Sequence, residues 1–141
     1  MNICFAISHY KFFHSHRLDL TKELAKTHAV SIVTDCSKAI PQEIKYLKSL
    51  GIEVINLPSR SKKNGYISYA LSLRRVIQNI NPEIVFYVTL EMSVFGAMIH
   101  HFLKIKKSFF LITGLGPFFY RTKLKYLALK YIQRLLFAFA L

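Results

Sequence analysis

The strongest constraint on the fold of this chain is an alternation of short apolar segments with helical patterns. Four of the five apolar segments contain almost no polar residues, which is typical of strands covered on both faces. The alternation predicts an α/β fold, a Rossmann-like parallel sheet of about five strands with helices on both faces. The expected strands are 2–7, 29–34, 52–57, 83–89 and 108–113.

Helical patterns fill the intervals between these strands and follow the last one. Ser15 is expected to cap the first helix, and Pro41 stands in the first turn of the second. Gly51 suits the left-handed residue after a helix, and Pro82 stops the next one. The expected helices are 16–27, 41–50, 66–80, 92–103 and 122–140.

Composition limits the chain to one folded core. The chain has 141 residues, of which 52% are hydrophobic, which excludes a disordered chain. We expect a Rossmann-like domain over 1–120 and a basic, apolar C-terminal helix over 121–141. Cys4 and Cys36 have no ligand spacing and are expected to be reduced thiols in a cytoplasmic protein. No apolar run reaches the 18 or so residues of a membrane span.

Net charge is the exceptional quantity in this sequence. Twenty Lys and Arg residues against seven Asp and Glu give +13, and the last acid is Glu91. The C-terminal part is therefore expected to attract phosphates, a lipid surface or nucleic acid. Nucleic acid is disfavoured, because no helix-turn-helix, zinc-finger or RNA-binding pattern accompanies the charge. The bases beyond Glu91 are Lys104, Lys106, Lys107, Arg121, Lys123, Lys125, Lys130 and Arg134.

The loop after the first strand is rich in hydrogen-bond donors. In sheets of this kind ligands bind beyond the carboxyl ends of the strands, so the loops after the first, third, fourth and fifth strands are the candidates. After the first strand, "SHYKFFHSHRLDL" offers a sugar hydroxyl or a phosphate several donors. They are His9, His14, Ser15, His16 and Arg17. A solvated loop with ordinary surface histidines is the alternative, and no metal is expected, because carboxylates are scarce.

Two further loops have features of anion or sugar sites. After the third strand, Arg60 lies close to Asn64-Gly65, which suits either a phosphate or a basic exposed turn. After the fifth, Gly114 and Gly116 let backbone N–H groups approach a sugar or diphosphate, with a tight turn as the alternative. The dinucleotide fingerprint is absent, because Phe119 occupies its third glycine position.

Four motifs in these loops together resemble one family. "FFHSHRLDL" looks like F-x-S-H-R-L, "RSKKNG" like R-S-x-x-N-P, "VTLEMSVFG" like V-T-x-K-P-x-x-x-G, and "ITGLGPFF" like I-T-G-L-G-x-x-F. In this order and spacing they are similar to the N-terminal domain of subfamily-4-like glycosyltransferases of the GT-B fold. That resemblance points to the bacterial branch that builds surface polysaccharide and lipid-linked oligosaccharide, and it extends from Asn2 to about Phe119.

The resemblance implies an acceptor-binding half of a retaining, two-domain enzyme. The nucleotide-sugar donor would bind mainly to the other half, so no cofactor is expected in this one. The catalytic residues are not identified. The residues expected to line the acceptor or phosphate side are Ser15, His16, Arg17, Arg60, Asn64, Thr89, Thr113, Gly114 and Gly116.

The chain departs from the family pattern after the fourth strand. The family's strand-end histidine falls on Phe86, its lysine on Glu91 and its proline on Met92. An acid in place of a cation would repel an anionic substrate. Either the acceptor differs from that of the family or the activity has decayed.

The donor-binding half with its E-x7-E segment is absent from the sequence, which ends at Leu141. We therefore expect a truncated product, a split gene or one subunit of a two-chain enzyme, inactive alone, because transfer needs both substrates positioned together. The alternative function is a non-catalytic, membrane-associated subunit that recruits a donor-binding partner chain.

The C-terminal segment allows two interpretations. It is either an interfacial helix on an anionic membrane or a core helix with a missing partner surface. The expected location is the cytoplasm, peripheral to the inner face of the cytoplasmic membrane, with a lipid-linked or saccharide acceptor as partner.

Overall fold

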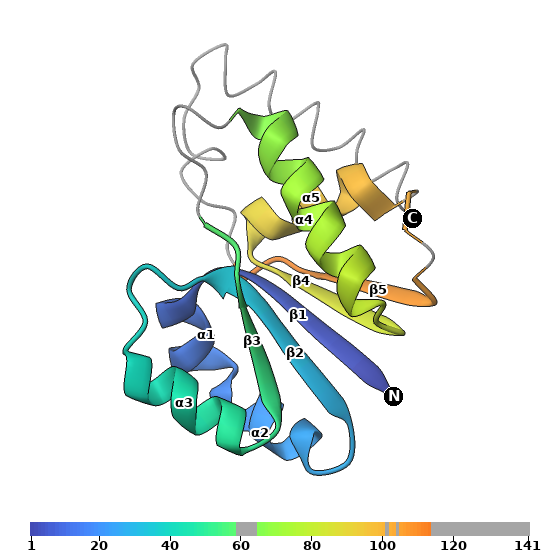
Figure 1. Ribbon diagram of the computed structural model, residues 1–141. Coiled ribbons are helices and arrows are strands. Elements are labelled where there is room, and N and C mark those ends of the chain that lie inside the picture. Colours follow the sequence, from blue (N-terminus) through green and yellow to red (C-terminus); the bar gives the residue numbers. More distant parts are fainter. Residues whose placement is uncertain (59–64, 101, 104, 114–141) are drawn as a thin grey trace.

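Five parallel strands form one sheet in the computed structural model, which describes residues 1–58, 65–100, 102–103 and 105–113. The strand order β3-β2-β1-β4-β5 and the α/β class confirm the predicted Rossmann-like fold (Figure 1). The strands are β1 Asn2–His9, β2 Ala29–Asp35, β3 Ile52–Asn56, β4 Ile84–Val88 and β5 Lys107–Leu111.

Helices cover the two faces of this sheet in two groups. In Figure 1 α1, α2 and α3 lie on one side of the sheet, while α4 and α5 lie on the other. The chain moves outward from β1 to β3, then returns to β4 beside β1 and moves the opposite way. Because parallel crossovers are right-handed, the reversal places the later helices on the opposite face. The helices are α1 Tyr10–His16, α2 Leu18–Ala25, α3 Pro41–Ser49, α4 Tyr66–Ile80 and α5 Leu90–His100.

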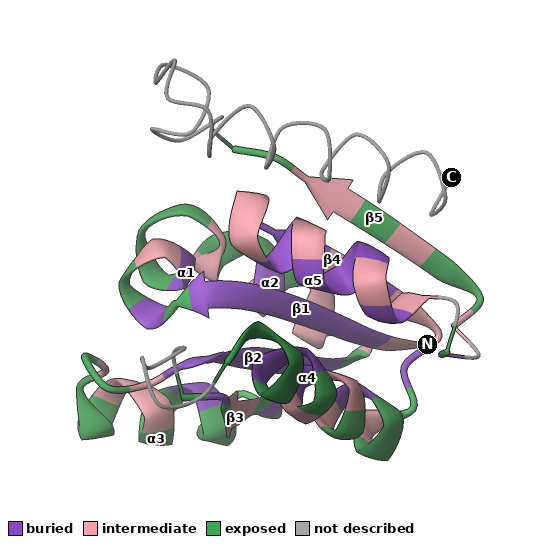
Figure 2. Ribbon diagram, turned by 90° about the horizontal axis from the view of Figure 1, so that it is seen from above, coloured by how far each residue is buried: buried purple, intermediate pink, exposed green. Residues whose placement is uncertain are grey.

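The central strand β1 contributes to two cores. Along it, Ile3, Phe5 and Ile7 enter the cluster beneath α1 to α3, while Cys4 and Ala6 enter the cluster beneath α4 and α5. Successive side chains of a strand point to opposite faces, so a fully apolar strand supplies both cores. Figure 2 shows β1 buried along most of its length, as this predicts.

The first predicted helix is wrong in its start and in its continuity. The chain forms two short helices there, and Ser15 lies inside α1, where its hydroxyl donates to the Lys11 carbonyl at 2.9 Å instead of capping a helix. The helix begins directly after β1 because Tyr10 and Phe13 are buried against the sheet. Arg17, with φ −130°, separates α1 from α2.

The other helix ends follow the sequence signals more closely. Gly51 has φ 77° after α3, as predicted, and Asn81 ends α4 with φ 47° just before Pro82. Helix α5 begins two residues earlier than expected, at Leu90, and ends at His100. The predicted helix 122–140 lies outside the described residues. None of the helices that the structure describes is long and apolar enough to cross a bilayer.

Candidate functional site at the carboxyl edge of the sheet

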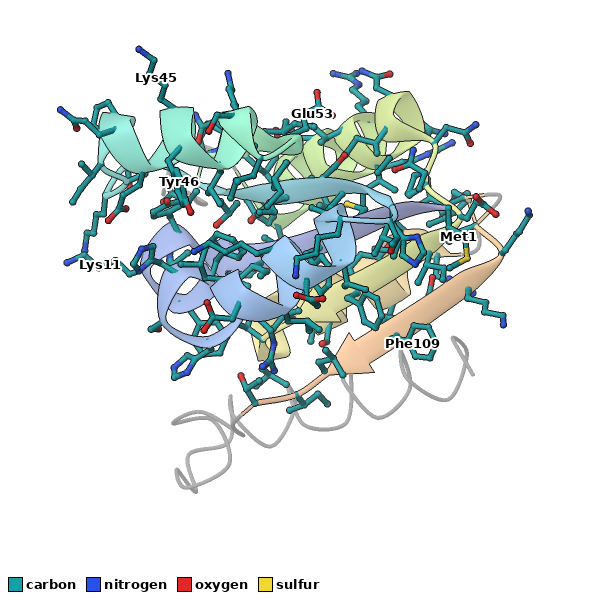
Figure 3. All side chains as sticks on the ribbon, turned by 90° about the horizontal axis from the view of Figure 1, so that it is seen from below. Met1, Lys11, Lys45, Tyr46, Glu53 and Phe109 are labelled. Atoms are coloured by element: carbon teal, nitrogen blue, oxygen red, sulfur yellow. The ribbon has the colours of Figure 1, made fainter. Side chains whose placement is uncertain are left out.

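The carboxyl ends of the parallel strands form one edge of the molecule. Since β1 lies between β2 and β4, the strand order reverses at β1, and ligands of such sheets bind at this point. In Figure 3 Lys11, one residue into the helix that follows β1, lies at the opposite end of the molecule from Met1. The site is therefore sought among the residues that follow β1, β2 and β4.

A β-bulge marks the end of β1. Ile7 pairs with Thr34 and His9 with Asp35, so Ser8 is an extra residue in β1 without a partner in β2. Ser8 is only 7% exposed, and its Oγ accepts a hydrogen bond from Thr89 Oγ1 at 3.1 Å. Two hydroxyls thus join β1 and β4 where the strand order reverses. We call them the Ser8–Thr89 pair.

Thr89 has an unusual backbone conformation. Its φ of 84° lies in a region that a β-branched residue rarely adopts, at a cost of about 1–3 kcal/mol. Two backbone hydrogen bonds maintain it: its N–H donates to the Leu111 carbonyl at 3.0 Å, and its own carbonyl accepts from the Ser93 N–H at 3.0 Å. Strain of this kind concentrates at functional sites. It directs the Thr89 hydroxyl towards β1 and starts α5 at the sheet edge.

Glu91 occupies the first turn of α5. A carboxylate is stabilised there by the helix dipole and by unpaired N–H groups. The acid that departs from the family pattern therefore fits its local structure. It also lowers the affinity of this helix end for a second anion.

A crevice of about 500 Å³ opens between α1 and the loop from β2 to α3, and His9, the residue after Ser8, lines it. Asp35 ends β2 at its base, is 7% exposed, and accepts the Ser37 N–H on Oδ1 at 2.9 Å. Lys11 and Lys38 are exposed on its rim. We call it the β2 crevice. It is lined by His9, Tyr10, Lys11, Phe12, Ser15, Asp35, Ser37 and Lys38.

Tyr10 forms an apolar part of the crevice wall. Its side chain is 2% exposed, and burial together with the nearby Glu43 carboxylate raises the pKa of its phenol to about 12. The phenol therefore stays neutral at physiological pH. Glu43 also approaches His14, with Oε1 and Nε2 3.5 Å apart, which ties α3 to α1 behind the crevice.

The structure brings some of the predicted site residues to this edge. Ser15 lines the β2 crevice, and Thr89 belongs to the hydroxyl pair. His9 lines the crevice as well, whereas His16 and Arg17 do not: the His16 ring lies 4.6 Å from that of Phe12, and the Arg17 guanidinium donates to the His16 carbonyl. Thr113 is exposed, two residues beyond β5. Arg60, Asn64, Gly114 and Gly116 lie outside the described residues.

Sequence reasoning missed the loop after β2. Ser8, Asp35, Ser37 and Lys38 were not among the predicted site residues, although "TDCSK" places an acid at the end of an apolar strand and a base three residues later. An acid in that position, followed by small polar residues, was the available signal.

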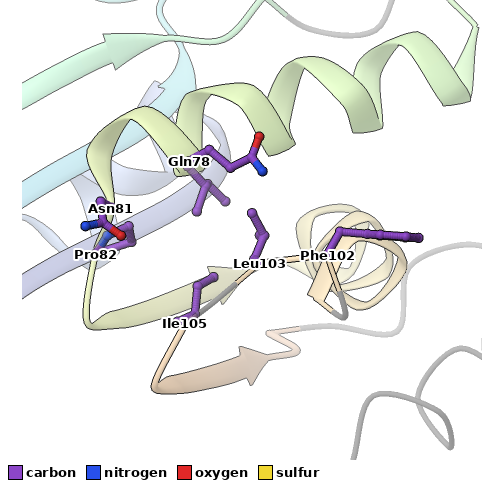
Figure 4. Close-up of a pocket in the computed structure, with 7 residues that line it drawn as sticks. Gln78, Asn81, Pro82, Phe102, Leu103 and Ile105 are labelled. Atoms are coloured by element: carbon purple, nitrogen blue, oxygen red, sulfur yellow. The ribbon is translucent and has the colours of Figure 1, made fainter.

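A smaller cavity of about 240 Å³ lies at the opposite edge of the sheet (Figure 4). It is formed by the end of α4 and by the segment that leads into β5, and none of the described residues that line it is charged. Polar groups that would orient a substrate are therefore few. Its lining residues are Ile77, Gln78, Asn81, Pro82, Phe102, Leu103 and Ile105.

Metal binding finds no support among the described side chains, which contain no group of three His, Cys, Asp or Glu residues placed to hold an ion. Both cysteines are free thiols, with Cys4 buried and Cys36 half-buried. Burial raises the pKa of both thiols, so neither is an activated nucleophile.

Comparison with known proteins identifies the family. The family described as "Glycosyl transferase 4-like" matches residues 2–141, nearly the whole chain. No curated protein matches the chain significantly. With its parallel sheet in the order β3-β2-β1-β4-β5, the chain belongs to the glycosyl transferase 4-like family.

Proposed function

We propose that this chain is the acceptor-binding domain of a retaining glycosyltransferase that moves a sugar from a nucleotide-sugar to a lipid-linked or polysaccharide acceptor. The observation that supports this most is the partly buried Ser8–Thr89 pair, which lies at the point where the strand order reverses. Family membership supplies the reaction class.

The chemistry of the pair suits a hydroxyl-bearing ligand. A hydroxyl group has one donor and two acceptor positions, and the hydrogen bond from Thr89 to Ser8 leaves the Ser8 O–H to donate elsewhere. Glu91 in the adjacent helix turn disfavours an anion at this position. We therefore assign a neutral, hydroxyl-bearing part of the acceptor to the pair.

Binding and orientation of the acceptor would be the contribution of this domain. Transfer requires donor and acceptor to be held together, and this proximity supplies much of the rate. Donor binding is assigned to a second domain, in the same or another chain. The net charge of +13 would favour an anionic membrane surface that presents a lipid-linked acceptor.

Acceptor kinetics test this assignment. In an active assembly that contains the donor-binding half, Ser8→Ala and Thr89→Val each remove one hydroxyl, and each is expected to raise the acceptor KM about three- to tenfold. Ser49→Ala is the control, because Ser49 is exposed on α3 and its hydroxyl donates to the Tyr46 carbonyl of the same helix. An acceptor KM unchanged in both edge variants would contradict acceptor binding here.

A non-catalytic subunit that recruits a donor-binding partner to the membrane is the second candidate, favoured by the eight bases that follow Glu91. It predicts that the chain binds anionic vesicles and the partner. It also predicts that the two edge variants leave the acceptor KM unchanged.

A further inference from the structure

We propose that the β2 crevice is a second acceptor subsite, which binds a sugar residue carrying a carboxylate or a phosphate. This inference rests on the proposed function and deepens it. It assigns a ligand to a cavity whose main polar residues, Asp35, Ser37 and Lys38, lie at the end of β2 and in the loop after it, which neither the motifs nor the family resemblance singled out.

The size and lining of the crevice suit one sugar residue. Its volume of about 500 Å³ is within the range of small-molecule sites, which combine apolar walls with a few fixed polar groups. Tyr10 and Phe12 supply the apolar wall, and Ser15 and Ser37 supply hydroxyls. A pyranose likewise has apolar ring carbons with hydroxyls at its periphery.

Asp35 is placed to accept hydrogen bonds from sugar hydroxyls. Its carboxylate is oriented by the Ser37 N–H, which donates to Oδ1. Hydrogen bonds to a charged acceptor are about twice as strong as those between neutral groups. A buried acid therefore selects a ligand with hydroxyl donors over one that consists of an anion alone.

The two lysines on the rim are the reason why we expect a negatively charged group on the ligand. Lys11 comes from α1 and Lys38 from the loop after β2, so they approach the crevice from opposite sides. With Asp35 included, the lining has a formal charge of +1. A neutral sugar would leave this excess uncompensated, whereas a uronate or a sugar phosphate would pair with the lysines while its hydroxyls meet Asp35.

The crevice and the Ser8–Thr89 pair lie next to each other along the chain. Ser8 precedes His9, which lines the crevice. An acceptor long enough to reach both positions would have its anionic residue in the crevice and a neutral sugar at the pair, where Glu91 disfavours an anion. The two positions together would distinguish acceptors by the charge of their sugars and by the order in which these sugars are linked.

A titration of the full 141-residue chain, followed by backbone amide resonances, tests the proposal. The ligands are methyl β-glucuronide, glucose 6-phosphate, methyl β-glucoside and inorganic phosphate. We expect the two anionic sugars to shift the amides of Lys11, Ser37 and Lys38, and to bind at least tenfold more tightly than the neutral glycoside or phosphate. A preference between the two shows whether the group is a carboxylate or a phosphate.

Matched variants test the residues. Lys38→Gln and Asp35→Asn are each expected to weaken anionic-sugar binding about tenfold. Asparagine keeps Oδ1 for the Ser37 N–H, so the turn is preserved. Lys45→Gln, an exposed change on α3 with the same loss of charge, is the control (Figure 3). Anionic-sugar binding that is weakened equally by Lys38→Gln and Lys45→Gln, and not weakened by Asp35→Asn, would indicate general electrostatic attraction and would overturn the subsite.

The remaining outcomes separate this inference from the proposed function. Equal binding of phosphate and anionic sugars would reduce the crevice to an anion site and overturn the inference. Saccharide-induced shifts confined to Ser8 and Thr89 would also overturn it, while leaving acceptor binding at the pair intact. Absence of saccharide-induced shifts from both positions would contradict both proposals.

Discussion

Gly96 of α5 lies against the ring of Tyr87 in β4 so closely that a Cβ at position 96 would come within 2.5 Å of the ring carbons Cγ and Cδ1. The ring has little room to move, because Tyr87 is fully buried and stacks on Phe110 with the ring centroids 5.3 Å apart. The absence of a side chain at 96 therefore sets the distance between α5 and the sheet. Through α5 it also sets the position of Thr89 and Glu91.

Gly96→Ala is expected to lower the free energy of unfolding by about 1–3 kcal/mol, although alanine is the better helix former. Denaturant unfolding measures the loss. Gly65→Ala is the comparison, because a Cβ there would meet no atom within 4 Å. Pairing Gly96→Ala with Tyr87→Leu is expected to recover part of the loss. If Gly96→Ala is as stable as wild type, the contact does not constrain α5.

Gly51→Ala tests backbone conformation without a steric contact. Gly51 has φ 77°, and an added Cβ would have no neighbour within 4 Å. The expected loss of about 1–2 kcal/mol is therefore the cost of the left-handed conformation alone. Gly51→Asn is expected to lose less, because asparagine tolerates this region. Equal losses in the two variants would point to a different cause.

Much of the fold was predictable because its signals are local. Apolar segments predicted the five strands, and the 66–80 pattern predicted α4 with its observed bounds. Gly51 and Pro82 act through their own backbones, so their positions near helix ends were correct. The alternation of strands and helices then fixed the parallel sheet, since right-handed crossovers leave few arrangements.

The predictions from sequence were wrong or incomplete where tertiary contacts determine the local structure. Ser15 resembles a helix cap, but burial of Tyr10 and Phe13 starts the helix earlier and leaves Ser15 inside it. Asp35 and Lys38 became site candidates only through the cavity that α1 forms with the next loop. The bulge at Ser8 depends on pairing with β2, which a single strand sequence does not specify. Site geometry was therefore less predictable than fold.

The strained backbone of Thr89 predicts an unusual order of stabilities. Thr89→Val loses the hydroxyl but keeps a β-branched residue at φ 84°, whereas Thr89→Gly loses the hydroxyl and relieves the strain. We expect the glycine variant to be about 1–2 kcal/mol more stable than the valine variant, as measured by chemical denaturation. Ser8→Ala removes the same hydrogen bond without changing this backbone and is the control. A valine variant at least as stable as the glycine variant would show that position 89 is unstrained.

Alkaline pH is expected to destabilise the fold through Cys4. Burial, with a smaller contribution from the Glu53 carboxylate, raises the pKa of the Cys4 thiol from 9.0 to about 12. Above pH 9 the unfolded chain therefore releases this proton while the folded chain retains it. The free energy of unfolding then falls with pH, with a slope from this group that approaches about 1.4 kcal/mol per pH unit.

Comparison of wild type with Cys4→Ala from pH 8 to 10 isolates this effect, because both proteins contain Tyr10, Tyr69 and Tyr87, whose pKa values burial also raises and which lower stability near pH 10 in both. Over this window the free energy of unfolding should fall less steeply with pH for Cys4→Ala than for wild type. The smaller side chain lowers the stability of the variant at every pH. Cys36→Ser should keep most of the slope, because Cys36 is only half-buried. Parallel profiles for wild type and Cys4→Ala would mean that the Cys4 thiol ionises as readily in the folded protein as in the unfolded chain.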